Sequence, residues 1–109
     1  NMTTVSYMPP EQAMGGEVTP RSDLYSLGAM LYEMVTGRPP FLGDDSVAII
    51  GQHINTPPVA PIWHNNECPR SLDALILLLL AKVPSERPDS ATDVLSALDA
   101  IDLTDALHW

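Results

Sequence analysis

The side chains best suited to bind metals or to act as nucleophiles are few and scattered. His53, His64 and Cys68 are the residues that suggest such a site, but their spacing matches no zinc pattern and four converging ligands cannot be found. Gly15 and Gly16 do not form a phosphate-binding loop, because such a loop also needs a lysine in a strand-to-helix turn. The sequence therefore predicts no catalytic residue, no metal site and no bound cofactor within these 109 residues.

A helix over residues 20–36 is expected to position the remaining polar groups. Thr19 and Pro20 form a start signal, a capping hydroxyl followed by proline at the first helical position. Gly37 is a favourable left-handed end. Asp23 falls in the first turn, where an acidic side chain stabilises the helix amino terminus by about 0.3–1 kcal/mol.

Apolar side chains cover nearly the whole circumference of this expected helix. A helix that is apolar all round belongs in the centre of a protein, enclosed by other elements. The rest of the chain offers little to enclose it, so the sequence predicts that partner structure is missing and that exposed apolar surface drives self-association. The apolar positions are Leu24, Tyr25, Leu27, Ala29, Met30, Leu31, Tyr32, Met34 and Val35.

The other segments also favour helices, and none shows the alternation typical of strands. The expected fold class is therefore all-α for this chain. Apolar periodicity, a capping-box pattern and proline positions indicate the element boundaries. The expected elements are a helical turn at 11–14, helices from 45 or 46 to about 53, at 70–82 and at about 90–101, a loop at 55–68, and a tail at 102–109.

Length and charge restrict the number of domains and the class of partner. A chain of 109 residues fits one domain. The formal net charge of −9 disfavours nucleic acid and anionic membrane surfaces. The longest apolar run, residues 74–81, is far shorter than the roughly 20 residues that span a bilayer. The single cysteine cannot form an internal disulfide, and a cytoplasmic location is expected for this segment, with any membrane anchor of a longer parent elsewhere.

Four segments share the order and spacing of known motifs. Residues 7–13 are Tyr-Met-Pro-Pro-Glu-Gln-Ala, and residues 22–28 are Ser-Asp-Leu-Tyr-Ser-Leu-Gly. Residues 38–41 are Arg-Pro-Pro-Phe, and residues 81–88 are Ala-Lys-Val-Pro-Ser-Glu-Arg-Pro. Together they resemble the carboxy-terminal lobe (C-lobe) of a eukaryotic-type protein kinase. The first segment is most similar to bacterial serine/threonine kinases, with Pro9 in place of the alanine of the Ala-Pro-Glu motif.

The resemblance covers residues 1–101 and leaves 102–109 as a tail. It implies a partial kinase C-lobe, the end of the activation segment plus about four helices, from a complete kinase fold of the α+β class. It also implies a buried ion pair between Glu11 and Arg87 that ties the activation segment to the lobe. Considered without the family, Glu11 is a solvated loop acid and Arg87 a turn residue.

The resemblance further implies roles for three residues near the substrate. Thr4 and Tyr7 correspond to residues that position the substrate, with Thr4 helping to place the hydroxyl that receives phosphate. The Asp23 carboxylate would accept hydrogen bonds from the backbone of the catalytic loop, in addition to its effect on the helix terminus. None of the three would itself react.

The resemblance implies a parent that is an ATP- and Mg²⁺-dependent serine/threonine protein kinase. In this family the groups that bind ATP and metal lie upstream, so the isolated segment is expected to be inactive. Its expected partners are a protein substrate with Ser or Thr hydroxyls and the amino-terminal part of the kinase domain. The alternatives are a pseudokinase that scaffolds partners, which loss of the upstream His-Arg-Asp, Asp-Phe-Gly and strand-lysine motifs would indicate, and an unrelated helical interaction domain.

Overall fold

Short helices packed around one long helix make up the chain. The computed structural model describes residues 2–106, with side chains from Thr4 onward. Within that range the regular elements are helices, joined by loops, and one isolated bridge. This confirms the expected all-α class. The elements in chain order are α1 (Met2–Val5), α2 (Pro10–Ala13), α3 (Pro20–Thr36), α4 (Ser46–Asn55), α5 (Pro61–His64), α6 (Arg70–Leu79), η1 (Pro84–Glu86) and α7 (Ala91–Asp99).

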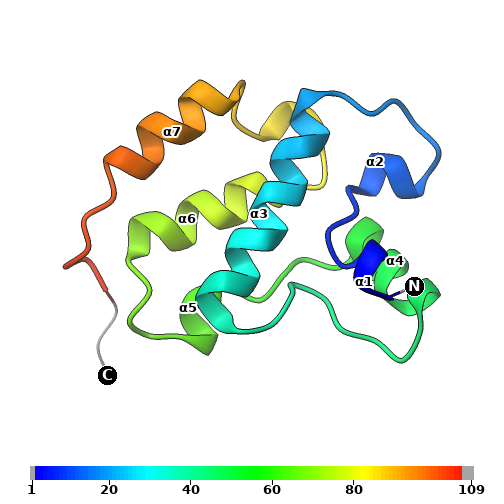
Figure 1. Cartoon of the computed structure of the whole chain (residues 1–109), viewed down its shortest axis with the longest axis horizontal. Helices are drawn as coiled ribbons and strands as arrows, with labels where there is room; N and C mark the ends of the chain where they lie inside the picture. Colours follow the sequence, from blue (N-terminus) through cyan, green and yellow to red (C-terminus); the bar gives the residue numbers. More distant parts are fainter. Residues whose placement is uncertain (1, 107–109) are drawn as a thin grey trace.

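The central helix α3 separates two groups of elements. Figure 1 shows α1, α2 and α4 gathered on one side of α3, with α6 and then α7 on the other. The turn η1 packs against α3 and brings the chain after α6 back towards the start of α3. As a result, residues from both ends of the sequence meet at the amino-terminal half of α3.

Both ends of α3 follow the expected signals. The backbone amide of Thr19 donates to Ser22 Oγ at 3.0 Å, so a hydroxyl in the first turn accepts the hydrogen bond of the residue before the helix. Pro20 occupies the first helical position, where a missing N–H is harmless. Gly37 ends the helix with φ 81°, a left-handed conformation that glycine adopts without strain. The predicted limits of this helix are confirmed.

The core of the chain lies between α3 and α6. One cluster joins Tyr25, Ala29 and Tyr32 to Ile76 and Leu80, and a second joins Leu24 to Leu75, Leu79 and Val94 of α7. Gly28 permits this close approach, because a Cβ at that position would lie 2.6 Å from Leu79 Cβ. Any larger residue would push the two helices apart.

The expectation that the chain cannot enclose its apolar helix is wrong for the side that faces α6. Leu24, Tyr25, Ala29 and Tyr32 are all buried by this chain alone. Among its large apolar side chains, the exposed ones are Met30, at 44%, and Met34, at 79%. The sequence pattern correctly indicated that α3 must be buried, but it underestimated how much of α3 the apolar side chains of α6 and α7 cover.

Several boundaries differ from the sequence expectation for local reasons. The helix α6 ends at Leu79 rather than near 82, because the carbonyls of Ala81 and Lys82 turn towards Arg87. The expected loop at 55–68 contains the short helix α5, begun by Pro61 at its first position. Four residues are too few for periodicity to reveal, and α1 escaped prediction for the same reason.

The end of the chain is partly fixed to the start of α6. The amide of Arg70 donates to the carbonyl of Asp105 at 2.5 Å, beside the antiparallel bridge of Pro69 with Ala106. Residues 107–109 of the expected tail lie outside the described residues, and the proposed division at residue 101 stays a prediction. Within residues 2–106, no helix combines the length and apolarity needed to cross a membrane.

Candidate functional site

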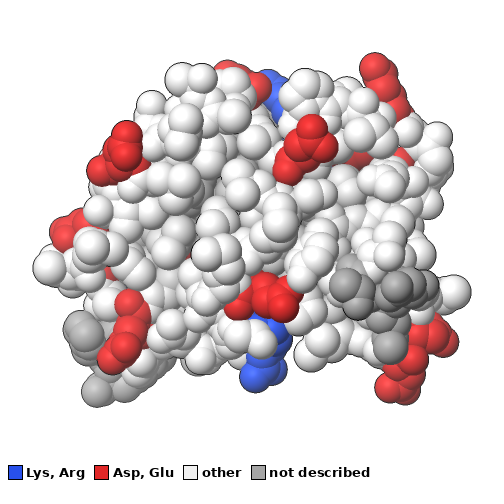
Figure 2. Space-filling model, in the orientation of Figure 1, with Lys and Arg blue, Asp and Glu red and all other residues white. Residues whose placement is uncertain are grey.

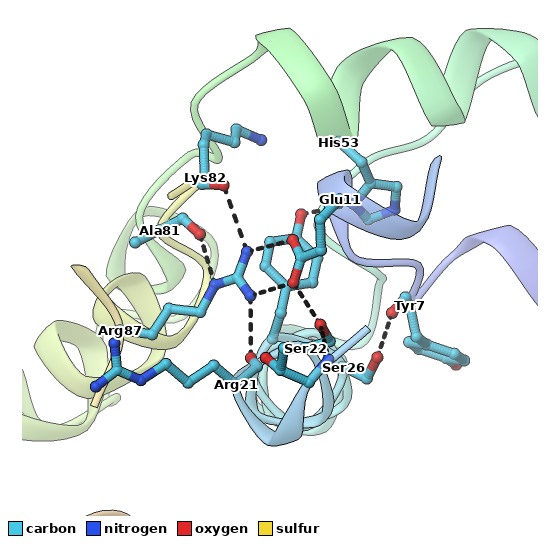
Figure 3. Close-up of polar contacts among 11 residues, drawn as sticks. Tyr7, Glu11, Arg21, Ser22, Ser26, His53, Ala81, Lys82 and Arg87 are labelled. Atoms are coloured by element: carbon cyan, nitrogen blue, oxygen red, sulfur yellow. Dashed lines mark hydrogen bonds and ion pairs between the residues drawn. The ribbon is translucent and has the colours of Figure 1, made fainter. Parts of the chain in front are cut away.

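Glu11 and Arg87 meet in a bidentate ion pair between α2 and the chain that follows η1. Arg87 Nη1 lies 2.7 Å from Glu11 Oε2, and Nη2 lies 2.9 Å from Oε1 (Figure 3). The Arg87 side chain is fully buried, and that of Glu11 is 12% exposed. The two parallel N–H···O bonds fit a guanidinium to a carboxylate and could not form with lysine. The structure therefore brings these two residues together as the family resemblance implied, and not as the solvated residues that their types alone suggested.

Arg87 is saturated with hydrogen bonds beyond this pair. Its Nε donates to the carbonyl of Ala81 at 2.8 Å, and its Nη atoms donate to those of Arg21 at 3.0 Å and Lys82 at 3.4 Å. The guanidinium carbon also lies 5.0 Å from the centre of the Tyr25 ring. All five N–H groups thus have acceptors, which is the condition for burying a charge without a large penalty.

The Glu11 carboxylate is held in its ionised form. Ser22 Oγ donates to Glu11 Oε2 at 2.6 Å and adds a third hydrogen bond to those from Arg87. Partial burial acts to raise the pKa of Glu11, but the hydrogen bonds from Arg87 and Ser22 outweigh it and lower the pKa to about 2. The carboxylate therefore joins α2, the first turn of α3 and the chain after η1 at any physiological pH.

Tyr7 is tied to α3 through both its side chain and its backbone. Its hydroxyl donates to Glu33 Oε1 at 2.5 Å, and Ser26 Oγ donates to its carbonyl at 2.7 Å (Figure 3). The hydrogen bond to Glu33, followed by partial burial and the negative charge, raises the pKa of Tyr7 above its ordinary value. Thr4, three residues earlier, is exposed on α1. The substrate roles predicted for both residues remain predictions.

An open hollow lies beside Tyr7 at the carboxy-terminal half of α3. It has a volume of about 460 Å³ and is lined by Tyr7, Met30, Glu33, Met34 and Gly37. In Figure 2 acidic groups are spread around the visible face, with a broad uncharged area between them and few basic groups. The lining of the hollow thus includes two exposed methionine side chains, Met30 and Met34, and the partly buried carboxylate of Glu33.

Asp23 lies in the first turn of α3, as expected, and is exposed. Within the described part of the chain, its carboxylate has no hydrogen-bond or ion-pair partner. Its available interaction is therefore with the helix amino terminus. The predicted acceptance of hydrogen bonds from a catalytic loop is untested.

The sequence interpretation missed the environment of two basic residues near the ion pair, the buried His53 and the partly buried Lys82. His53 on α4 is fully buried, and burial, followed by the charge of Lys82, lowers its pKa to about 4 against the opposing effect of the Val5 and Ser6 backbone. Lys82 donates to the carbonyl of Gln52 at 3.1 Å, and burial and the charge of Arg87 lower its pKa to about 8. The signal for His53 was its i+4 spacing from the buried Ile49, which places both on one helix face.

Metal ligands do not converge in the described part of the chain. No group of three or more His, Cys, Asp or Glu side chains there could hold a metal ion. His53 is engaged with Tyr25, while His64 packs its ring edge against Tyr32 at 6.2 Å between centroids. Cys68 is a buried free thiol.

Comparison with known sequences assigns this arrangement to a family. Residues 1–98 match the family described as the protein kinase domain. The chain is 46% identical over 91 residues to the serine/threonine-protein kinase PknB of Mycolicibacterium smegmatis, which covers 84% of this chain and 15% of the relative. It is 49% identical over 88 residues to the serine/threonine-protein kinase PksC of Streptomyces coelicolor, covering 81% of this chain and 16% of the relative.

A third relative extends the match slightly. The probable serine/threonine-protein kinase SCO3848 of Streptomyces coelicolor is 44% identical over 97 residues, covering 89% of this chain and 14% of the relative. A helical lobe closed by a buried Glu-Arg pair, with these matches, defines a protein kinase C-lobe. The chain belongs to the protein kinase family, in line with the resemblance to bacterial serine/threonine kinases. It spans about 15% of the length of the curated relatives it matches.

Proposed function

We propose that this chain is the substrate-docking and scaffold half of the C-lobe of an ATP- and Mg²⁺-dependent serine/threonine protein kinase. The observation that carries the proposal is the saturated Glu11–Arg87 pair, which fixes the segment holding Thr4 and Tyr7 against α3 and α4. The names of the relatives, all serine/threonine-protein kinases, support Ser and Thr hydroxyls as acceptors.

The chemical step is assigned to the rest of the kinase domain. Phosphoryl transfer needs a loop over the phosphates, a lysine paired with a glutamate, metal-binding side chains and a residue that orients the hydroxyl. In this proposal ATP and Mg²⁺ are held by other parts of the kinase domain. In this proposal Thr4 and Tyr7 position the substrate hydroxyl, and Asp23 accepts hydrogen bonds from the backbone of the catalytic loop.

The partners follow from the same assignment. The chain contacts a protein substrate with Ser or Thr residues and the amino-terminal part of the kinase domain. The exposed Met30 and Met34 side of α3 supports association with that part or with a second copy. Because ATP is supplied in the cytoplasm, we place the chain there, with any membrane anchor outside this segment.

The test measures transfer of labelled γ-phosphate from ATP to a mixture of serine- and threonine-containing peptides. The intact protein with Mg²⁺ is expected to phosphorylate the peptides, and the isolated chain is not. Thr4→Ala is expected to reduce the rate of the intact protein, and Thr4→Ser, which keeps the hydroxyl, is the matched control. Transfer by the isolated chain would contradict the assignment. An intact protein that binds partners but transfers no phosphate would instead be a pseudokinase.

A further inference from the structure

His53 is a buried polar side chain that the ion pair does not use. It projects from α4 and is fully buried, with its ring edge-on to Phe41 at 5.0 Å and to Tyr25 at 5.6 Å between centroids. A phenylalanine or leucine would fill this apolar space without the cost of removing two ring nitrogens from water. The presence of histidine therefore calls for polar partners on both sides of the ring.

The first partner is the Tyr25 hydroxyl, 2.6 Å from His53 Nδ1. Burial, partly offset by the charge of Arg87, raises the pKa of Tyr25, so the phenol keeps its proton. A phenol that donates to Nδ1 leaves the ring proton on Nε2. The neutral ring then presents an N–H group on its opposite side.

The second side of the ring is Nε2, on a helix that packs against both α1 and α2. In the described part of the chain, Nε2 has no partner that meets full hydrogen-bond geometry. The backbone of Val5 and Ser6 acts to raise the pKa of His53, which is the effect of carbonyl oxygens on the N–H side of an imidazole ring. The alternative tautomer would turn an Nε2 lone pair towards those oxygens and be repelled by them.

The same short segment is held from a second helix. Ser26 Oγ of α3 donates to the carbonyl of Tyr7 at 2.7 Å, while the carbonyl of Val5 accepts from the amide of Met8 at 3.2 Å. A carbonyl has two lone pairs, so Val5 can accept a further bond from His53. Figure 3 shows His53 and Ser26 on either side of the region that carries Glu11 and Tyr7.

We propose that His53 is a positioning residue that directs its Nε2–H group to the Val5 and Ser6 carbonyls and fixes the backbone between Thr4 and Tyr7. This inference deepens the proposed function and rests on it, because that segment is the one assigned to meet the substrate. His53 acts through the backbone and does not touch the reacting atoms.

The test uses two substitutions of His53 and one control in the intact protein. His53→Phe keeps the ring and removes both nitrogens, while His53→Gln keeps an amide N–H near the position of Nε2. His64→Gln, at an exposed site, is the matched control. The measurements are hydrogen exchange of the amides of residues 5–8, the KM for a serine/threonine peptide, the KM for ATP and kcat.

His53→Phe is expected to raise both the amide exchange rates of residues 5–8 and the peptide KM by about three- to tenfold. This factor corresponds to the net contribution of one hydrogen bond. The KM for ATP should not change. His53→Gln should recover most of the loss, and His64→Gln should resemble the wild type. Unchanged exchange at residues 5–8 in His53→Phe, or an equal increase throughout α3 and α6, would overturn the proposal.

Two further results keep the inference separate from the proposed function. If the wild-type intact protein transfers no phosphate, the proposed function fails, but the exchange rates still decide the role of His53. If His53→Phe does not fold, Tyr25→Phe replaces it, because it keeps the ring under Arg87 and removes the hydroxyl that fixes the tautomer. Exchange at residues 5–8 should then rise by a smaller factor, and no rise would refute the proposal.

Discussion

The two ends of α3 differ in how far the rest of the chain covers them. Around its first turns, Arg87 and Glu11 are buried with every N–H of the guanidinium satisfied from this chain. At its carboxy-terminal half, Met30 and Met34 remain exposed beside an open hollow. The first region holds the lobe together, and the second leaves apolar surface for something to cover. Burial and exposure of side chains are thus assigned to separate turns of one helix.

The largest change in unfolding free energy should follow from removing the ion pair at the amino-terminal end of α3. Glu11→Ala leaves the Arg87 charge buried without its carboxylate, which costs about 3–5 kcal/mol of unfolding free energy when one partner of a buried pair is removed. Urea denaturation of the intact protein measures it. Glu17→Ala, an exposed acid in the following loop, is the control with the same change in charge. Equal midpoints for the two variants would show that the pair does not hold the lobe.

Acidification tests the same end through His53. Its pKa is about 4 in the folded chain against an ordinary value of 6.5. Above pH 6.5 the ring is neutral in both states. As pH falls from 6.5 towards 4, the unfolded chain takes up the proton first, so the unfolding free energy should drop by an amount on the order of 3 kcal/mol.

The effect of His53 on the unfolding free energy can be told from that of its neighbours, because each group titrates in a different pH range. Lys82 and Tyr25, which face the ring, keep their charge states between pH 6.5 and 4. Glu11 loses its contribution at lower pH, between 4.5 and about 2. In His53→Phe the drop between pH 6.5 and 4 should disappear while the lower one remains. A drop of the same size in both proteins would assign it to another group.

The covered middle of α3 should be sensitive to added volume. Gly28→Ala places a Cβ 2.6 Å from Leu79 Cβ, so the unfolding free energy should fall by about 1–3 kcal/mol through overpacking. Gly51→Ala on α4 is the matched control, since nothing lies within 4 Å of its added methyl. There the substitution should stabilise the helix by up to about 1 kcal/mol. Calorimetry measures the unfolding free energy of both variants. No loss in Gly28→Ala would show that the α3–α6 interface can accommodate the added methyl group.

The smallest effect is expected at the open end. Met34→Gln removes an apolar group that is already 79% exposed, so the unfolding free energy should change by less than about 0.5 kcal/mol. Light scattering should at the same time show weaker self-association if this side of α3 drives it. A loss of more than about 1 kcal/mol would mean that the intact protein covers Met34 within its own fold.

Features set by neighbours in sequence were the predictable part of the fold. Thr19, Pro20 and Gly37 gave both ends of α3, since caps depend on the residues beside them. The end of α6 was not predictable from its leucines, because the pull of Arg87 on the Ala81 and Lys82 carbonyls acts across the fold. Helices of four residues, such as α1 and α5, carry too little periodicity to detect.

The candidate site was predictable only in part. Glu11 and Arg87 are 76 residues apart, and spacing alone could not pair them; the family resemblance did. Ser22 and the carbonyls around Arg87 were missed, because backbone acceptors have no sequence signature. His53 could have been recognised as buried from its spacing to Ile49, but its contact with Tyr25 depends on how α4 packs against α3.

The separation of Glu11 from Arg87 has a consequence for synthesis. The pair joins residues that are 76 positions apart, and closing so long a loop carries an entropy cost that the contacts formed inside it must repay. During translation the Glu11–Arg87 pair can form only after residue 87 has left the ribosome. Until then the earlier contacts, such as the hydrogen bond from Ser22 to Glu11 and that from Ser26 to the Tyr7 carbonyl, are the ones available to hold the amino-terminal segment.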